Sequence, residues 1–128
     1  MVVTIPVSWG ELFDKLTILE IKQARIDNQQ KLVNINRELE ALRRICGEHQ
    51  LPDDPLQALI DELRRTNESL WDIEDDIRAC ERKRDFSDEF IQLARSVYRT
   101  NDKRAGLKLK INHLLGSELI EEKSYQAY

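Results

Sequence analysis

Three polar residues interrupt an apolar stripe in the last third of the chain. Apolar residues recur at helical spacing between Phe90 and Leu115, and Asn101, Arg104 and Lys108 occupy the same phase. These positions share one helix face, because residues three, four and seven apart lie on the same side of an α-helix. Charges on a core face are costly unless they are paired. The stripe therefore predicts either a ligand site or an internal salt-bridge network.

The two preceding helical segments also carry polar residues on the faces that should meet this stripe. Counting back from the connection of an antiparallel hairpin places Asn67 near Arg104 and Glu74 near Tyr98. The residues that we expect to bind a ligand in a polar interhelical pocket are Lys15, Lys22, Glu74, Arg78, Tyr98, Asn101, Arg104 and Lys108.

Bases outnumber acids in this set, in which Glu74 is the only acid and Asp14 and Asp75 lie at the flank. A bound carboxylate or phosphate would complete the charge set, and arginine suits this role because its planar guanidinium binds such groups bidentately. Alternatively, the long basic side chains reach back to water, and Glu74 and Arg78 form an ordinary i, i+4 surface pair. If the pocket is catalytic, Glu74 is the candidate acid or base.

The chain is expected to form one all-α domain over residues 1–128. A charged fraction of 34% with only 4 Gly and 3 Pro favours long helices over a β fold. We predict an antiparallel bundle of three long helices, with an extended N-terminal arm and a short C-terminal helix that begins at Ser117. The predicted ranges are 1–8 for the arm and 9–46, 55–84 and 88–115 for the three helices.

The first of these helices has two apolar faces. Leu16 and Leu19 belong to one stripe, whereas Ile35 and Leu39 lie on nearly the opposite side. A helix with two apolar faces is either central in its own bundle or shared with another subunit. We therefore expect a homodimer.

Charge and composition disfavour several classes of function. The net charge of −4 argues against sequence-independent nucleic-acid binding. No stretch approaches the roughly 20 apolar residues of a membrane span, and the N-terminal sequence lacks the pattern of a signal peptide. Cys46 and Cys80 are typical of free thiols, so we expect a cytoplasmic protein. The histidines are isolated and the carboxylate spacings are those expected by chance, so we predict neither a metal site nor a cofactor.

Four segments resemble the signature blocks of a small bacterial family of short helical proteins of unknown function. They are PVSWGELFDKLTILEIK, LWDIEDDIR, FIQLARSVYRTNDKRAGLKLKIN and EEKSY. Members of this family are encoded beside, or fused to, glycosyltransferases of surface-polysaccharide and lipopolysaccharide assembly. The resemblance implies a context in glycan biosynthesis without naming an activity. The polar residues of the blocks correspond to Asp14, Lys15, Glu20, Lys22, Trp71, Glu74, Asp75, Arg78, Arg95, Tyr98, Asn101, Arg104 and Lys108.

Three hypotheses about function remain open. In the first, the protein is an accessory to a glycosyltransferase and binds an anionic ligand, either a phosphorylated sugar or a nucleotide sugar, in the polar pocket. In the second, it is a dimeric structural or adaptor module whose polar residues form an internal salt-bridge network. In the third, it is a mutase-like or lyase-like enzyme that acts on an anionic substrate by electrostatic stabilisation.

Overall fold

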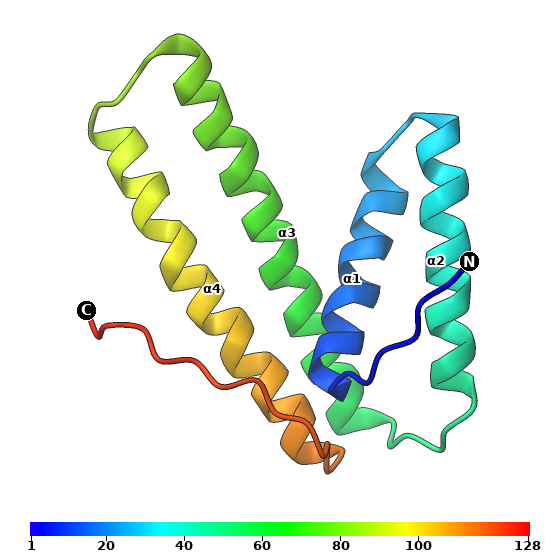
Figure 1. Ribbon diagram of the computed structural model, residues 1–128. Helices are drawn as coiled ribbons and strands as arrows, with labels where there is room; N and C mark the ends of the chain where they lie inside the picture. Colours follow the sequence, from blue (N-terminus) through cyan, green and yellow to red (C-terminus); the bar gives the residue numbers. More distant parts are fainter.

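The computed structural model describes residues 1–128 and consists of four α-helices joined by short connections (Figure 1). It confirms the all-α fold class. The helices are α1 (Trp9–Arg25), α2 (Gln29–Gly47), α3 (Asp54–Lys83) and α4 (Asp88–Leu114). The bounds of α3 and α4 lie within one residue of the predicted ranges. None of the four helices combines the length and the apolar character that a membrane-spanning segment needs.

The single long helix predicted over residues 9–46 is wrong, because the chain breaks into α1 and α2. Ile26 leaves the helix with φ −94° and ψ 129°, and Asn28 is also extended. The Asn28 side chain accepts a hydrogen bond from the Lys31 amide at 3.0 Å and caps α2. Asp and Asn side chains compete for nearby backbone groups and so favour caps and turns over helix interiors. The pair Asp27–Asn28 therefore stops a helix whose apolar pattern would otherwise continue.

This break explains the two apolar faces of the segment. Leu16 and Leu19 of α1 pack against Ile35 and Leu39 of α2 in one buried cluster. The two stripes cover each other within one hairpin, so they do not require a second subunit. The homodimer stays a prediction without this support.

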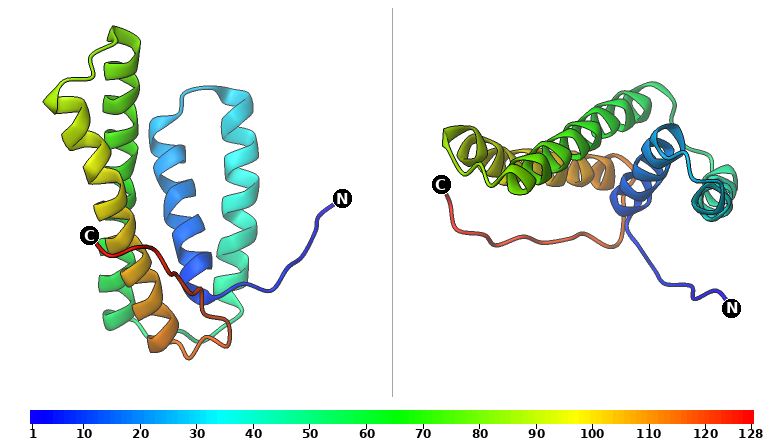
Figure 2. Two further views of the ribbon diagram at one scale, coloured as in Figure 1. Left: turned by 60° about the vertical axis from the view of Figure 1, so that its left-hand side comes forward. Right: turned by 90° about the horizontal axis from the view of Figure 1, so that it is seen from above.

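α1 lies between α2 and the hairpin formed by α3 and α4 (Figures 1 and 2). The two hairpins are close together where α1 and α3 begin, and they diverge toward their other ends (Figure 1). A second buried cluster joins α1, α3 and α4 at the close end. Its members are Phe13, Leu56, Ile60, Leu63, Leu107 and Ile111. The core therefore fixes how α1 meets α4, which is the contact that positions the polar residues.

The residues after α4 form no helix, so the short C-terminal helix predicted from Ser117 is wrong. Gly116 adopts a positive φ of 61°, and the amide of Ser117 bonds the carbonyl of Asn112 at 2.8 Å. Ser117 also accepts a hydrogen bond from the amide of Trp9 at 3.2 Å. These contacts turn the chain, and residues 117–128, here called the tail, run back alongside α4 (Figure 2).

Candidate functional site

A buried carboxylate lies where α1, α3 and α4 meet. The side chain of Asp14, on α1, is only 2% exposed. Arg104 of α4 binds it bidentately, through Nε to Oδ1 at 2.9 Å and through Nη2 to Oδ2. Asn67 of α3 donates its amide to Asp14 Oδ1 at 3.0 Å and to Thr17 Oγ1 at 3.1 Å. No fully buried side-chain nitrogen or oxygen here lacks a hydrogen-bond partner, which is the condition for keeping a charge in the interior.

Lys108 extends the same arrangement by one turn of α4. Its Nζ lies 2.8 Å from Glu11, 3.1 Å from Glu121 of the tail and 3.8 Å from Asp14. Burial lowers the pKa of Lys108, but the hydrogen bonds to Glu11 and Glu121 and the charge of Asp14 outweigh it, so the pKa is raised. The ammonium therefore remains charged. We call Asp14, Asn67, Arg104 and Lys108 the inner network.

From the sequence, the inward-facing bases were expected to outnumber the acids. This expectation is wrong for Arg104 and Lys108. Asp14, Glu11 and Glu121 all lie within salt-bridge distance of Arg104 or Lys108. A signal for Glu11 was present, because the first turn of α1 places it one turn before Asp14 on the same face. Glu121 belongs to the block EEKSY, but its segment was expected to be helical, so it was not expected beside Lys108.

Arg104 nevertheless keeps donors that the inner network does not use. A guanidinium carries five N–H groups in a planar fork, and the bidentate pair with Asp14 engages the edge formed by Nε and Nη2. The hydrogen bond to Asp14 raises the pKa of Arg104, which keeps it cationic. The Arg104 side chain is 29% exposed and lines two cavities. Asp14 thus fixes the orientation of a cation that is partly exposed and borders both cavities.

The first cavity lies between α4 and the tail and has a volume of about 650 Å³. We call it the tail pocket. The rings of Tyr98 and Tyr128 lie 5.0 Å apart on its wall, between centroids. Its polar and aromatic lining consists of Tyr98, Asn101, Asp102, Arg104 and Lys108 from α4 and of Lys123, Tyr125, Gln126 and Tyr128 from the tail.

The second cavity, here called the interhelical cleft, opens between α1, α3 and α4 and has a volume of about 410 Å³. Trp71, Glu74 and Asp75 line it from α3, opposite Asn101 and Arg104 of α4. Asn101 and Arg104 are shared with the tail pocket, so the two cavities lie on either side of these residues.

The structure brings together part of the predicted residue set. Tyr98, Asn101, Arg104 and Lys108 line the tail pocket, and Glu74 lines the interhelical cleft.

Three predicted residues line neither of these cavities: Lys15, Lys22 and Arg78. Lys15 forms a surface ion pair with Glu38 at 3.2 Å. Arg78, with 78% of its side chain exposed, pairs with Glu74 at 3.4 Å, which is the surface pairing that the sequence offered as the alternative.

Sequence reasoning missed the tail residues of the pocket. Lys123, Tyr125 and Tyr128 lie in a segment without regular secondary structure, so no periodicity could assign them a face. Two signals were available: the block EEKSY contains Lys123 and Tyr125, and two tyrosines occur within four residues at the end of the segment.

The sequence model of DUF6165, a family of unknown function, matches residues 2–128. No curated protein and no solved structure matches the chain. The match spans both cavities and the inner network.

Proposed function

The chain belongs to DUF6165, a family of unknown function, and we propose that it binds an anionic sugar in the tail pocket. The ligand class is a phosphorylated sugar or a nucleotide sugar, and the role is that of an accessory to glycosyltransferases in surface-polysaccharide or lipopolysaccharide assembly. The glycan context comes from the signature blocks, which resemble those of proteins encoded beside such enzymes. The free thiols agree with a cytoplasmic location for this role.

The observation that carries the proposal is the fixed orientation of the partly exposed Arg104. A guanidinium binds phosphate through two parallel N–H donors, and it does so best when its rotamer is already fixed. Asp14 fixes this rotamer from the buried side. Binding a phosphate at the outer edge therefore requires no new ordering of the arginine, which removes part of the entropic cost of binding.

The remaining lining of the tail pocket suits the rest of such a ligand. Lys108 and Lys123 also line the pocket, and both would be available to a ligand phosphate once it displaces Glu121, with which each is paired. Tyr98, Tyr125 and Tyr128 offer flat apolar faces with hydroxyl groups at their edges, which pack against sugar or base rings. A cavity of about 650 Å³ lies within the roughly 300–1,000 Å³ range of small-molecule sites.

Glu121 is the carboxylate that a ligand phosphate would replace at Lys108. Glu11 and Asp14 belong to α1, whereas Glu121 belongs to the tail and keeps 48% of its side chain exposed. Exchanging one anion for another at Lys108 leaves the ammonium paired throughout. Ligand entry and movement of the tail are therefore coupled in this proposal.

The test is a calorimetric titration with three probes: UDP-glucose, glucose 1-phosphate and glucose. We expect binding of the two phosphorylated probes and none of glucose. Tyr125→Ala should weaken the binding of UDP-glucose, whereas Phe86→Ala, an exposed aromatic outside the pocket, should not. Absence of heat with both phosphorylated probes, or an equal affinity for glucose, contradicts the proposal.

One observation favours the structural alternative. Arg104 and Lys108 are already paired with carboxylates, as a network that only fixes helix register would require. Under that alternative no probe binds, and the substitutions affect stability alone. The enzyme alternative gains less support, because Glu74 is 54% exposed and bonded to Arg78 on the surface.

A further inference from the structure

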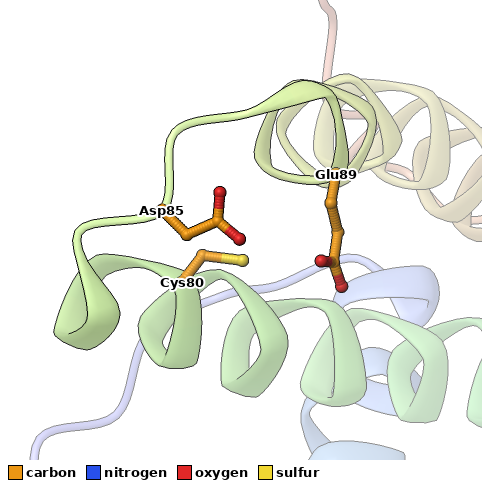
Figure 3. A group of neighbouring side chains, drawn as sticks. All are labelled: Cys80, Asp85 and Glu89. Carbon is orange, nitrogen blue, oxygen red and sulfur yellow. The ribbon is translucent and has the colours of Figure 1, made fainter.

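Three groups that can bind a metal converge where α3 turns into α4. Cys80 lies in the last turn of α3, Asp85 in the connection and Glu89 in the first turn of α4 (Figure 3). Their ligand atoms, one sulfur and two carboxylate oxygens, all lie within 4.8 Å of one another. We call these residues the hairpin-tip cluster. The cluster is not a pair of carboxylates at helical spacing, because its members come from three different elements.

The backbone directs Asp85 toward the thiol. Arg84 adopts a left-handed conformation with φ 54°, and the amide of Asp85 then bonds the carbonyl of Cys80 at 2.9 Å. The amide of Ser87 donates to Asp85 Oδ1 at 3.1 Å and fixes the carboxylate. These contacts hold Asp85 beside Cys80 whether or not an ion is present.

The thiol itself points to a missing partner. Cys80 is only 6% exposed, is not in a disulfide and makes no hydrogen bond through its sulfur. Figure 3 shows the sulfur directed into the space that the carboxylates of Asp85 and Glu89 also face. A buried structural cysteine normally faces apolar neighbours, whereas this one faces two acids.

No base forms an ion pair with the two carboxylates, although Lys83 is near enough for its charge to act on Asp85. Neither Asp85 nor Glu89 forms a salt bridge, although Asp14, the buried acid of the inner network, has two cations within 4.0 Å. Two carboxylates beside a buried thiol disfavour the thiolate unless a cation binds with it. A divalent ion would reverse that balance, because bound cations are the largest charges in such a site.

We propose that Cys80, Asp85 and Glu89 bind a divalent transition-metal ion of the Zn²⁺ class. A thiolate with carboxylate oxygens suits a borderline-soft ion, whereas Mg²⁺ and Ca²⁺ prefer oxygen ligands alone. Binding forms a metal–sulfur bond and releases the thiol proton to solvent. Three protein ligands leave a fourth tetrahedral position for water.

The site would join the end of α3, the connection and the start of α4 through one ion. Its role is therefore to hold the tip of the hairpin, the part that diverges from α1 and α2 (Figure 1). This inference is independent of the proposed ligand in the tail pocket, because the hairpin-tip cluster shares no residue with that pocket.

Cobalt is the most direct probe, because a thiolate ligand gives Co²⁺ a charge-transfer band in the near ultraviolet. The reduced, chelator-treated full chain should take up an equimolar amount of Co²⁺ with this band, and Zn²⁺ should displace it. Cys80→Ser should abolish the band, whereas Cys46→Ser, the matched variant at the other thiol, should keep it. The inference is overturned by a missing band in the unmodified chain, or by a band that needs Cys46 instead of Cys80.

The carboxylates provide a second arm that does not depend on the folding of the cysteine variant. Asp85→Asn and Glu89→Gln should each weaken Zn²⁺ binding, measured by competition with a chromophoric chelator. We expect at least the roughly 10-fold loss that follows removal of even an indirect partner of a metal. Glu81→Gln changes an exposed acid on the same turn of α3 and should leave the affinity unchanged. Unchanged affinity in both Asp85→Asn and Glu89→Gln contradicts the site.

Discussion

The inner network and the hairpin-tip cluster place carboxylates in contrasting surroundings: Asp14 is buried, whereas Asp85 is half-buried and Glu89 is exposed. In the inner network, Asp14 is buried and meets both Arg104 and Lys108 within 4.0 Å. In the hairpin-tip cluster, two carboxylates face the buried Cys80 and no base pairs with them. The first arrangement is complete within the fold and can use only its outer edge for a ligand. The second lacks a counter-charge, which an ion from outside can supply.

The largest predicted effect tests that contrast with the same chemical change at both places. Asp14→Asn leaves Arg104 without its bidentate acceptor, and breaking a buried pair on one side costs about 3–5 kcal/mol. We expect the free energy of unfolding to fall by about 3 kcal/mol, the lower end of this range, because Arg104 is partly exposed. Glu89→Gln in metal-free protein should change the free energy of unfolding by less than about 0.5 kcal/mol. Urea denaturation measures both, and equal losses would remove the distinction between the two clusters.

The next effect concerns the close contact of α1 and α4 beside the inner network. A Cβ on Gly10 would overlap the carbonyl oxygen of Lys108 and lie 2.9 Å from Asn112 Oδ1. Gly10→Ala should therefore force the helices apart and cost roughly 1–3 kcal/mol of unfolding free energy. Gly106→Ala has no neighbour within 4 Å and lies inside α4, so it should stabilise the protein by roughly 0.5–1 kcal/mol. The melting temperatures of Gly10→Ala and Gly106→Ala should therefore shift in opposite directions from that of the unmodified chain. A shift in the same direction would show that the contact is not tight.

A smaller effect compares the turns of the two hairpins. Asn28 caps α2 through a side-chain hydrogen bond, whereas Ser87 precedes α4 without one. Asn28→Ala should lower the free energy of unfolding by about 1 kcal/mol, and Ser87→Ala by less than about 0.5 kcal/mol. Denaturant midpoints distinguish them. If Asn28→Ala costs no more than Ser87→Ala, the side-chain cap of Asn28 does not stabilise the start of α2.

The smallest effect is the pH dependence of tail attachment. The hydrogen bond from Lys108 lowers the pKa of Glu121 below its ordinary value of 4.5. This contact is therefore present above pH 4.5 and is lost as the pH falls through the lowered pKa. NMR shifts of the Tyr125 and Tyr128 rings should report release of the tail on acidification. Glu121→Gln should abolish this step and Glu122→Gln should keep it, and a step that persists in Glu121→Gln would contradict the assignment.

Helical periodicity was sufficient to predict where α3 and α4 lie and that Arg104 and Lys108 of α4 face inward, because they lie on the same stripe as Ile111. It did not identify Leu107 and Asn112, which are also buried. Counting across the α3–α4 hairpin placed Asn67 near Arg104, and in the structure both residues bind Asp14. These features follow from the helical period and from the antiparallel pairing of neighbouring helices, so they can be predicted from the sequence.

Features that depend on competition between local and long-range contacts could not be predicted in the same way. The apolar pattern runs through Asp27 and Asn28, and only the cap at Asn28 decides that α1 ends there. Glu121 reaches Lys108 because Gly116 turns the chain back along α4. The hairpin-tip cluster likewise needs the left-handed Arg84 to bring Asp85 back to α3.

The central claim is that the outer edge of Arg104 binds an anion while Asp14 holds its inner edge. Arg104→Lys keeps the positive charge beside Asp14 but removes the second donor edge, and Arg65→Lys makes the same change at an exposed site that lines neither cavity. Titrating both variants with glucose 1-phosphate measures the change in binding affinity that tests this claim. We predict that Arg104→Lys weakens binding by about 10-fold or more, since a hydrogen bond to a charged group contributes about 1.5–3 kcal/mol. Equal affinities in Arg104→Lys, Arg65→Lys and the unmodified chain would contradict it.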